Sequence, residues 1–190
     1  MEQIQLNTLK ESVKKGRVAN TYLLVGKADS DVLGAGFDLI KDIIKSPFAA
    51  KEIHEQQASL EKLKTLTNPE IHHFDPLTTT AEVKTKANSK DFIDHWRELV
   101  SSGTKIALAD WYNKIGLVNK QAAINKGEAE EISRIASLKS YEGGVKIFLI
   151  WMAEKMNLSA SNKLLKLVED PPKNTVVMLI CEKEGMLLST

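Results

Sequence analysis

The sequence contains a single cysteine, Cys181, among its 190 residues. One cysteine cannot form an internal disulfide or supply a cysteine-based zinc site, and at the end of an apolar run it is expected to be a small buried hydrophobe. Long apolar runs are also missing, since none approaches the roughly 18 residues that span a bilayer. The first residues, MEQIQLNTLKESVKKG, are polar and amphipathic, unlike the apolar core of a signal peptide. These absences predict a soluble cytoplasmic protein with no membrane partner.

An excess of charge of either sign is absent as well. Lysine and arginine number 26 against 25 aspartates and glutamates, a formal net charge of +1. This balance gives no general attraction to nucleic acid, so any basic surface must be local. The hydrophobic fraction of 43% and the charged fraction of 27% are ordinary for a soluble globular protein. The length fits one domain, or one domain and a fragment, with a substantial hydrophobic core.

Short apolar runs alternate with amphipathic helical patterns along the chain. Runs closed by turn residues predict strands at 21–26, 71–74, 145–150 and 175–181. Apolar residues spaced by three and four predict helices at 3–15, 32–45, 53–66, 92–100 and 129–136, and another from a cap at Asn157 or Ser159 to the prolines at 171–172. Residues 77–90 predict a loop, and 103–125 has no clean period. The alternation favours an α/β fold whose parallel sheet is covered on both faces.

The turn after the first predicted strand lacks most of the residues that bind phosphate. A phosphate-binding loop of the form GxxxxGK[ST] uses glycines so that backbone N–H groups surround the phosphates, a lysine that neutralises them, and a hydroxyl that holds magnesium. The corresponding stretch, which begins at Gly26, is GKADSDVL. Only the first glycine is present, because Asp31, Val32 and Leu33 replace the second glycine, the lysine and the hydroxyl.

Acidic residues in the same turn oppose nucleotide binding. Asp29 and Asp31 add negative charge where phosphate would lie, and Lys27 comes too early in the loop to replace the missing lysine. One unit-charge repulsion at about 4 Å costs on the order of 4 kcal/mol at an effective dielectric constant near 20. A millimolar ligand has a binding free energy of only about 4 kcal/mol. The turn therefore predicts that no nucleotide cofactor is bound.

The end of the strand at 145–150 also lacks catalytic chemistry. In nucleotide-hydrolysing proteins of this layout, carboxylates at this position hold magnesium and prime a water molecule. Here the strand runs into Trp151 and Met152, which do neither. The sequence thus predicts no ATP hydrolysis, no catalytic residue and no metal site. Two alternatives remain open from the residues alone: a polar turn that was never a nucleotide site, and a P-loop ATPase or other nucleotide-binding enzyme with a divergent loop.

Two stretches of the sequence resemble a known family. GRVANTYLLVG at 16–26 and KSYEGGVKIFLIWMAEKMNLSASNKLLKLVEDPPKNTVVMLI at 139–180 closely resemble the delta-prime subunits of the bacterial DNA polymerase III clamp loader, which belong to the AAA+ family. The second stretch follows the order Walker B strand, loop, helix, Pro-Pro and sensor-1 strand. NPEIHHFDP, around the second predicted strand, also matches, whereas residues 77–127 match only weakly.

The resemblance implies a fold and a role. The fold is the AAA+, or P-loop NTPase-like, three-layer sandwich with a parallel sheet of about five strands, the last of which is expected to be missing from this chain. The role is that of a non-catalytic stator that helps load the sliding clamp during DNA replication. The implied partners are the gamma/tau and delta subunits and, more weakly, the sliding clamp. Trp151 and Met152 would occupy the positions of the hydrolytic carboxylates, and an AAA+-like adaptor in another complex is the remaining alternative.

The sequence departs from the family pattern in two places. Many relatives carry a four-cysteine zinc module after the first helix, but residues 46–68 contain no cysteine, so no zinc is expected. The chain also ends at EGMLLST, where the family continues into a Ser-Arg-Cys motif, a lid domain and a collar domain. We therefore expect residues 1–190 to be the N-terminal AAA+ (RecA-like) domain of a longer protein, and a monomer in isolation.

Two further groups of residues are candidate sites. His72 and His73 are adjacent in a predicted strand, so their rings are expected on opposite faces, which disfavours a metal site. Four lysines follow the strand at 145–150: Lys155, Lys163, Lys166 and Lys173. A solvated helical face is their default interpretation. The alternative is a patch that contacts the DNA backbone in the assembled loader, because phosphate contacts position a protein without reading bases.

Overall fold

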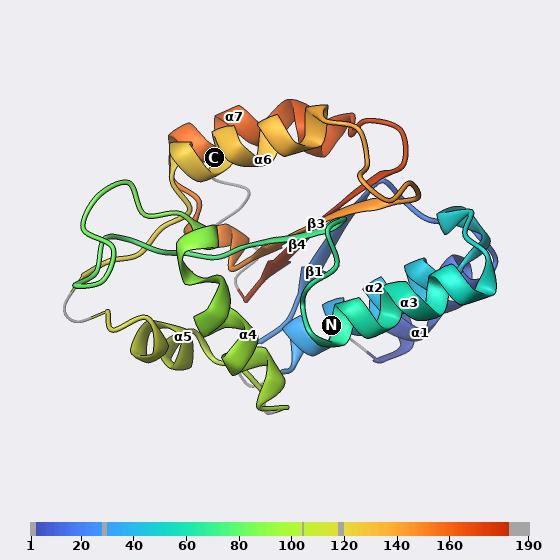
Figure 1. The fold of residues 1–190 in the computed structure, drawn as a ribbon, viewed down its shortest axis with the longest axis horizontal. Coiled ribbons are helices and arrows are strands. Elements are labelled where there is room, and N and C mark those ends of the chain that lie inside the picture. Colours follow the sequence, from blue (N-terminus) through green and yellow to red (C-terminus); the bar gives the residue numbers. More distant parts are fainter. Residues whose placement is uncertain (1–2, 28–29, 104, 118–119, 183–190) are drawn as a thin grey trace.

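Four parallel strands form the centre of the structure (Figure 1). The computed structural model describes residues 3–27, 30–103, 105–117 and 120–182. The sheet has the order β1–β4–β3–β2, with β1 at Thr21–Val25, β4 at Thr175–Cys181, β3 at Lys146–Trp151 and β2 at Ile71–Phe74. Every residue of β3 and β4 is buried, as expected for central parallel strands that are covered on both faces.

The carboxyl ends of the strands meet at one edge of the sheet. Val25 of β1 is paired with Cys181 of β4, and Trp151 of β3 is paired with Ile180. In open parallel sheets, ligands bind in the crevice outside the carboxyl ends of the strands. The turns that follow β1 and β3 therefore lie at the edge where a nucleotide site would be expected.

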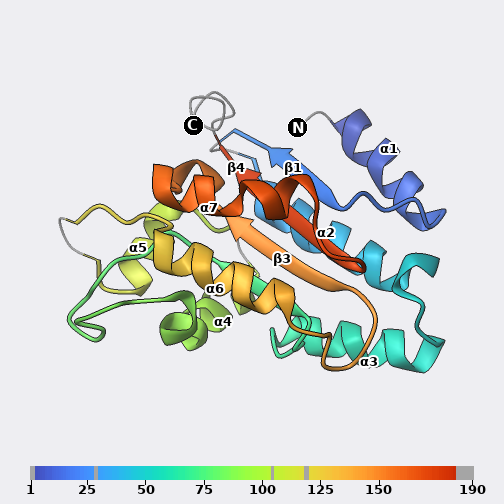
Figure 2. The same ribbon diagram turned by 90° about the horizontal axis from the view of Figure 1, so that it is seen from above.

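Helices cover both faces of the sheet (Figures 1 and 2). Their bounds are α1 Gln3–Lys14, α2 Val32–Lys45, α3 Ile53–Lys64, α4 Ile93–Ser101, α5 Leu108–Lys114, α6 Lys126–Ser137 and α7 Leu158–Glu169, with 3₁₀ turns η1 Pro47–Ala49, η2 Ser89–Phe92 and η3 Ala153–Lys155. Helices α6 and α7 lie on one face, and α1, α2 and α3 lie on the other, with α4 and α5 on that side near the carboxyl edge. The result is a three-layer α/β sandwich.

Each face of the sheet has its own hydrophobic core. Phe148 packs with Ile132 of α6 and Leu164 of α7 on one face. Leu149 packs on the other face, in a core that also contains residues of α2 and the tryptophans of α4 and α5. Alternation along β3 thus divides its side chains between two separate cores.

Polar side chains begin several of the helices. The side chain of Asp31 accepts the Gly34 N–H at the start of α2, Asn125 accepts the Gly127 N–H at the start of α6, and Asn157 accepts the Ala160 N–H at the start of α7. These are the residue types that pair best with the unpaired N–H groups of a first turn. Of the two caps considered for α7, the structure selects Asn157.

The predicted helices and strands are confirmed with small shifts at their ends, and the α/β class is confirmed. About five strands were expected, and the described residues form four of them. The sequence did not assign α5, which lies in the stretch without a clean period. Among the residues described, no helix combines the length and the apolar character needed to cross a membrane.

Candidate functional site at the carboxyl edge of the sheet

The described residues of the turn between β1 and α2 contact one another and the end of β4. The Gly26 N–H donates to the Cys181 carbonyl oxygen at 3.0 Å, which fixes the start of the turn against β4. The Ser30 hydroxyl donates to the Lys27 carbonyl oxygen at 2.7 Å. A Cβ on Gly26 would lie 2.3 Å from the Ser30 Oγ and 2.7 Å from the Val32 Cβ, so only glycine fits. Ser30 and Val32 therefore occupy the space beside the Gly26 Cα.

A carboxylate of the protein itself lies at the amino end of α2. The Asp31 Oδ1 accepts the Gly34 N–H at 2.9 Å. Helix amino ends attract anions because their first N–H groups are unpaired and the helix dipole is positive there. A Cβ on Gly34 would lie 2.2 Å from the Asp31 Oδ2, so the carboxylate is held closely against the backbone. Asp31 thus occupies the place in which a phosphate would be stabilised.

The other residues of the turn differ in their exposure. Val32 and Leu33 are 6% and 4% exposed and belong to the hydrophobic core. Lys27 is exposed to solvent. Asp29, the second acidic residue of the predicted loop, lies outside the described residues. The two positions that would carry a cation and a magnesium ligand therefore carry core side chains instead.

The end of β3 is hydrophobic and fully buried. Trp151 and Met152 are each 1% exposed. The Trp151 ring lies 5.4 Å from that of Trp96, which lies 5.5 Å from that of Trp111. Met152 has a left-handed backbone, with φ of 53° and ψ of 50°, which is uncommon for a residue other than glycine. An indole and a thioether in such surroundings offer no oxygen ligand to magnesium and no base to a water molecule.

One carboxylate does lie at this edge, three residues after Trp151. The Glu154 Oε1 accepts the Glu182 N–H at 3.2 Å, and its Oε2 is buried without a hydrogen-bond partner among the described residues. Burial raises the pKa of Glu154 above its ordinary value. The sequence gives little signal for Glu154, because the hydrolytic carboxylates of this layout are expected at positions 151 and 152. Because Glu154 accepts a backbone N–H just after β4, its role is structural: it holds the 3₁₀ turn after β3 against the end of β4.

A buried polar group lies at the carboxyl end of β2. The His73 Nε2 is 3.7 Å from the Asp75 Oδ2, and neither oxygen of Asp75 has a hydrogen-bond partner among the described residues. Burial, followed by the nearby Glu128 carboxyl group, raises the pKa of Asp75 well above its ordinary value. Burial also lowers the pKa of His73 to about 3. Both pKa shifts favour the uncharged forms of His73 and Asp75. The pair is therefore part of the protein interior and does not form a site for charged ligands.

The polar group continues into the next segment of the chain. The Ser89 hydroxyl donates to the Glu128 Oε2 at 2.7 Å, and the Ser89 N–H donates to the Glu128 Oε1 at 2.9 Å. The Asp75 N–H in turn donates to the Ser89 Oγ at 3.3 Å. Burial raises the pKa of Glu128, against the opposing effect of its bonds from Ser89. These bonds fasten the start of α6 to the end of β2.

The histidines lie as the strand pattern predicted. The His72 ring stacks on Phe148 in one core, and the His73 ring stacks on Trp96 in the other. Their rings therefore lie on opposite faces of the sheet. Among the described residues, no group of three or more histidine, cysteine, aspartate or glutamate side chains has an arrangement that suits a metal ion. Cys181 is buried at the end of β4, as expected.

A cavity of about 790 Å³ lies beside the start of α6, and its lining contains no residue of either turn. Its charged lining residues are Lys86, Lys90, Glu130 and Glu131, so positive and negative charges balance. Lys90 and Glu131 form an ion pair with each other. A triphosphate needs an excess of positive charge, which this lining does not provide. The cavity therefore does not replace the phosphate turn as a nucleotide site.

Comparison with known proteins identifies relatives of this chain. A family model described as DNA polymerase III, delta subunit, matches residues 1–190. The delta' subunit of DNA polymerase III from Bacillus subtilis is 25% identical over 193 residues, which cover 100% of this chain and 45% of that protein. The delta' subunit from Pseudomonas aeruginosa is 46% identical over 48 residues, which cover 25% of this chain and 15% of that protein. The chain thus spans less than half the length of these relatives.

A solved structure shares the fold. It is a protein related to the DNA polymerase III gamma subunit, from Thermotoga maritima, with a TM-score of 0.51 and 16% sequence identity. The likeness covers 97% of this chain and 43% of that one. At this identity it establishes the architecture alone, which is consistent with an AAA+ domain. The family match over residues 1–190 shows that the chain belongs to the family of DNA polymerase III delta-prime subunits.

Proposed function

We propose that residues 1–190 form the AAA+ domain of a delta-prime clamp-loader subunit that acts as a non-hydrolysing stator in the cytoplasm. One observation carries the proposal: both turns that would hold a nucleotide are filled by the protein's own side chains. Asp31 lies on the amino end of α2, and Trp151 and Met152 are buried at the end of β3. A subunit of this kind contributes a fixed surface to the loader and no chemical step.

Electrostatics supports the absence of nucleotide binding. A phosphate at α2 would have to displace the Asp31 carboxylate or lie beside it. Two like charges about 4 Å apart repel by on the order of 4 kcal/mol at an effective dielectric constant near 20. The displaced cap would cost about a further 1 kcal/mol. With a buried valine at position 32 in place of a lysine, no opposite charge offsets these terms.

The partners that we propose are the gamma/tau and delta subunits and, more weakly, the sliding clamp. We also propose a sequence-independent contact with the DNA backbone in the assembled loader. Lys163 and Lys166 on α7, and Lys173 after it, are exposed, and Lys155 is half-buried. None of the four takes part in an ion pair among the described residues, so their charge is available to phosphate.

A titration with magnesium-ATP tests the stator proposal. Trp151 lies at the end of β3, so tryptophan fluorescence reports on that corner, and calorimetry provides an independent signal. We expect no saturable binding up to millimolar ATP. The Asp31→Asn variant is the matched control, because its side-chain oxygen still caps α2 while the charge is gone. Micromolar binding to the unchanged protein would contradict the proposal and favour a P-loop enzyme with a divergent loop.

A pull-down tests the place of the protein in the loader. The full-length protein is expected to retain the delta and gamma/tau subunits of the same organism. Charge reversal of Lys163 and Lys166 to glutamate should weaken retention of duplex DNA by the assembled complex while the subunits still assemble. Failure to retain either subunit would instead favour an AAA+-like adaptor in another complex.

A further inference from the structure

The connection between β2 and α6, residues 75–125, carries two helices in the part where the family resemblance is weakest. In Figure 1, α4 and α5 lie near the carboxyl edge of the sheet, on the side away from α6 and α7. Trp96 of α4, Trp111 of α5 and Phe92 of the preceding turn η2 are among the largest buried side chains in the described part of the protein, and each is 0% exposed. The connection is thus packed deeply against the sheet along its helices.

The indole of Trp96 joins three separate parts of the chain. Its ring lies 5.1 Å from that of His73 on β2, with the two planes 6° apart. It lies 5.4 Å from the ring of Trp151 at the end of β3, and 5.5 Å from that of Trp111 on α5, which it meets edge to face. Stacked and edge-to-face arrangements at these distances are favourable. Trp96 therefore lies between α5 and the two strand ends.

The Trp111 indole attaches this aromatic cluster to the start of the connection, just after β2. Its Nε1–H donates to the Pro76 carbonyl oxygen at 2.9 Å. Its ring meets that of Phe92 edge to face, with the centroids 6.3 Å apart. A hydrogen bond and a ring contact together fix α5 relative to the end of β2. The cluster is thus anchored at both of the strands that it touches.

We propose that the β2–α6 connection orders the end of β3 without any nucleotide. Trp96 and Trp111 pack against this corner, which consists of Trp151 and Met152, and keep it in one conformation. The left-handed backbone of Met152 fits this role, because strained residues persist where their surroundings over-determine them. The inference extends the proposed stator role, but it does not depend on the loader partners. It states that the corner is ordered internally and does not respond to nucleotide.

Amide hydrogen exchange with peptide-level mass spectrometry tests the proposal on the whole protein. The Trp96→Ala variant removes the ring that joins the helices to β3. Residues 149–156 and 92–101 should then exchange at least tenfold faster, together, while residues 21–25 of β1 keep their protection. Phe148→Ala is the matched control, since Phe148 is 0% exposed but packs in the core on the other face of the sheet. The Phe148→Ala variant should not increase the amide exchange rate of residues 149–156 and 92–101 relative to that of β1.

Faster exchange in 92–101 alone, with 149–156 as in the unchanged protein, would overturn the proposal. If Trp96→Ala does not fold, exchange of the unchanged protein in low urea decides the question. The two segments should then open with the same urea dependence, and separate openings would contradict the coupling. Trp96→Phe should behave like the unchanged protein, because the Trp96 Nε1 has no hydrogen-bond partner among the described residues.

The last measurement repeats the amide exchange in the presence of magnesium-ATP. Up to millimolar concentration it should leave exchange at 149–156 unchanged within twofold. Tenfold slower exchange would show that the corner responds to nucleotide, and the inference would fail. A negative pull-down together with coupled exchange would instead reject the loader role and leave the inference standing.

Discussion

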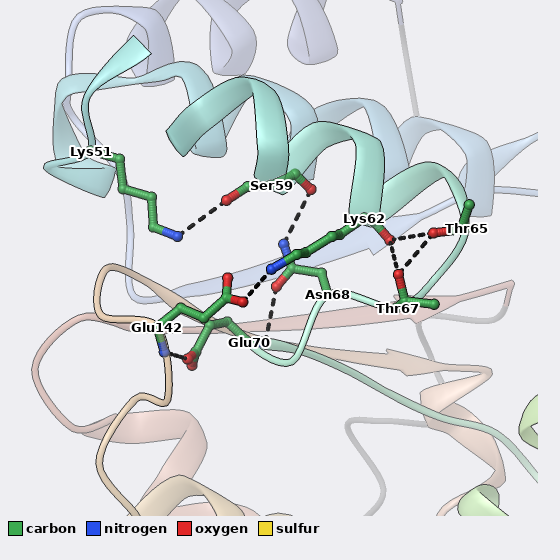
Figure 3. A network of polar contacts seen from close by, with 8 residues as sticks. All are labelled: Lys51, Ser59, Lys62, Thr65, Thr67, Asn68, Glu70 and Glu142. Atoms are coloured by element: carbon green, nitrogen blue, oxygen red, sulfur yellow. Dashed lines mark hydrogen bonds and ion pairs between the residues drawn. The ribbon is translucent and has the colours of Figure 1, made fainter. Parts of the chain in front are cut away.

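The two ends of the sheet are held together by different kinds of interaction. At the amino end, α3, the start of β2 and the turn before β3 are joined by a connected set of hydrogen bonds (Figure 3). The Asn68 side chain donates to the Ser59 carbonyl oxygen at 3.2 Å and accepts the Glu70 N–H at 3.0 Å. The Glu142 N–H donates to the Glu70 Oε1 at 2.7 Å. The buried side chains of Asn68 and Glu70 therefore have hydrogen-bond partners.

At the carboxyl end, aromatic rings surround several buried polar atoms that lack partners. The His73 Nε2, both oxygens of Asp75 and the Trp96 Nε1 are buried without a hydrogen bond among the described residues. Stability there depends on packing and on the uncharged state of the polar groups. One small domain thus accommodates buried polar groups in two ways: Asn68 and Glu70 are hydrogen-bonded, whereas His73 and Asp75 are held in their uncharged forms.

The largest expected effect comes from a charge at the packed end. Trp151→Asp would restore an acidic residue at the end of β3, but it removes a fully buried indole and leaves a carboxylate among aromatic rings. We expect a loss of about 4 kcal/mol or more in the free energy of unfolding, measured by urea denaturation. No ATP binding should appear. The Trp151→Phe variant should keep most of the stability, and a stable Trp151→Asp variant would contradict the closed corner.

A smaller loss is expected at the hydrogen-bonded end. Asn68→Ala leaves the Ser59 carbonyl oxygen and the Glu70 N–H without their partner inside the protein. Removing one partner of buried hydrogen bonds costs about 1–3 kcal/mol, and we expect about 2 kcal/mol by urea denaturation. Thr67→Ala is the control in the same network, because Thr67 is exposed and should change stability by less than about 0.5 kcal/mol. Equal effects of the two variants would show that burial is not what matters here.

The pH dependence of stability should separate the two ends. Because the pKa of Asp75 is raised in the folded protein, its contribution is fully present below the unfolded pKa near 3.8 and is lost as pH rises toward the folded pKa. Asp75→Asn cannot ionise, so its stability relative to the unchanged protein should grow as pH rises above about 4. We expect a gain of about 1 kcal/mol at pH 7, measured by urea denaturation between pH 4.5 and 8.

The contribution of His73 to stability has the opposite pH dependence, both in the unchanged protein and in Asp75→Asn. Its pKa falls to about 3 on folding, so its stabilising contribution is present above the ordinary value of 6.5 and is lost as pH falls toward 3. Subtracting one pH profile from the other therefore isolates Asp75. A difference that does not depend on pH would show that Asp75 is already ionised in the folded protein.

The smallest effect is expected from the exposed ion pair of the amino end. Lys62 and Glu142 are paired, and their side chains are 41% and 26% exposed. Exposed pairs contribute about 0.2–1 kcal/mol, so Lys62→Ala should lower stability by no more than about 0.5 kcal/mol at low salt. The loss should vanish in about 1 M salt, where charges are screened within roughly 3 Å. A loss as large as that of Asn68→Ala would mean that the pair helps to hold the network together.

Much of the site was predictable because it depends on local sequence. The apolar residues at positions 32 and 33 can be read directly from the sequence, and so can Trp151 and Met152 in place of acidic residues. Asp31 was predicted to repel phosphate, but its bond to the Gly34 N–H emerged only from the structure. The contact between Trp96 and Trp151 was out of reach, because a poorly patterned segment gives no signal of which strand its aromatic residues will meet.

The α/β class, the order of helices and strands, and the chemistry that is missing from the two turns follow from the sequence alone. Those properties arise from side-chain periodicity and from residue types within a few positions of one another. Tertiary structure alone decided that the β2–α6 connection packs against the end of β3, and that Asn68, Glu70 and Glu142 share one network. Such contacts join segments far apart in the chain. They are fixed by the packing of whole elements against one another, which no local pattern specifies.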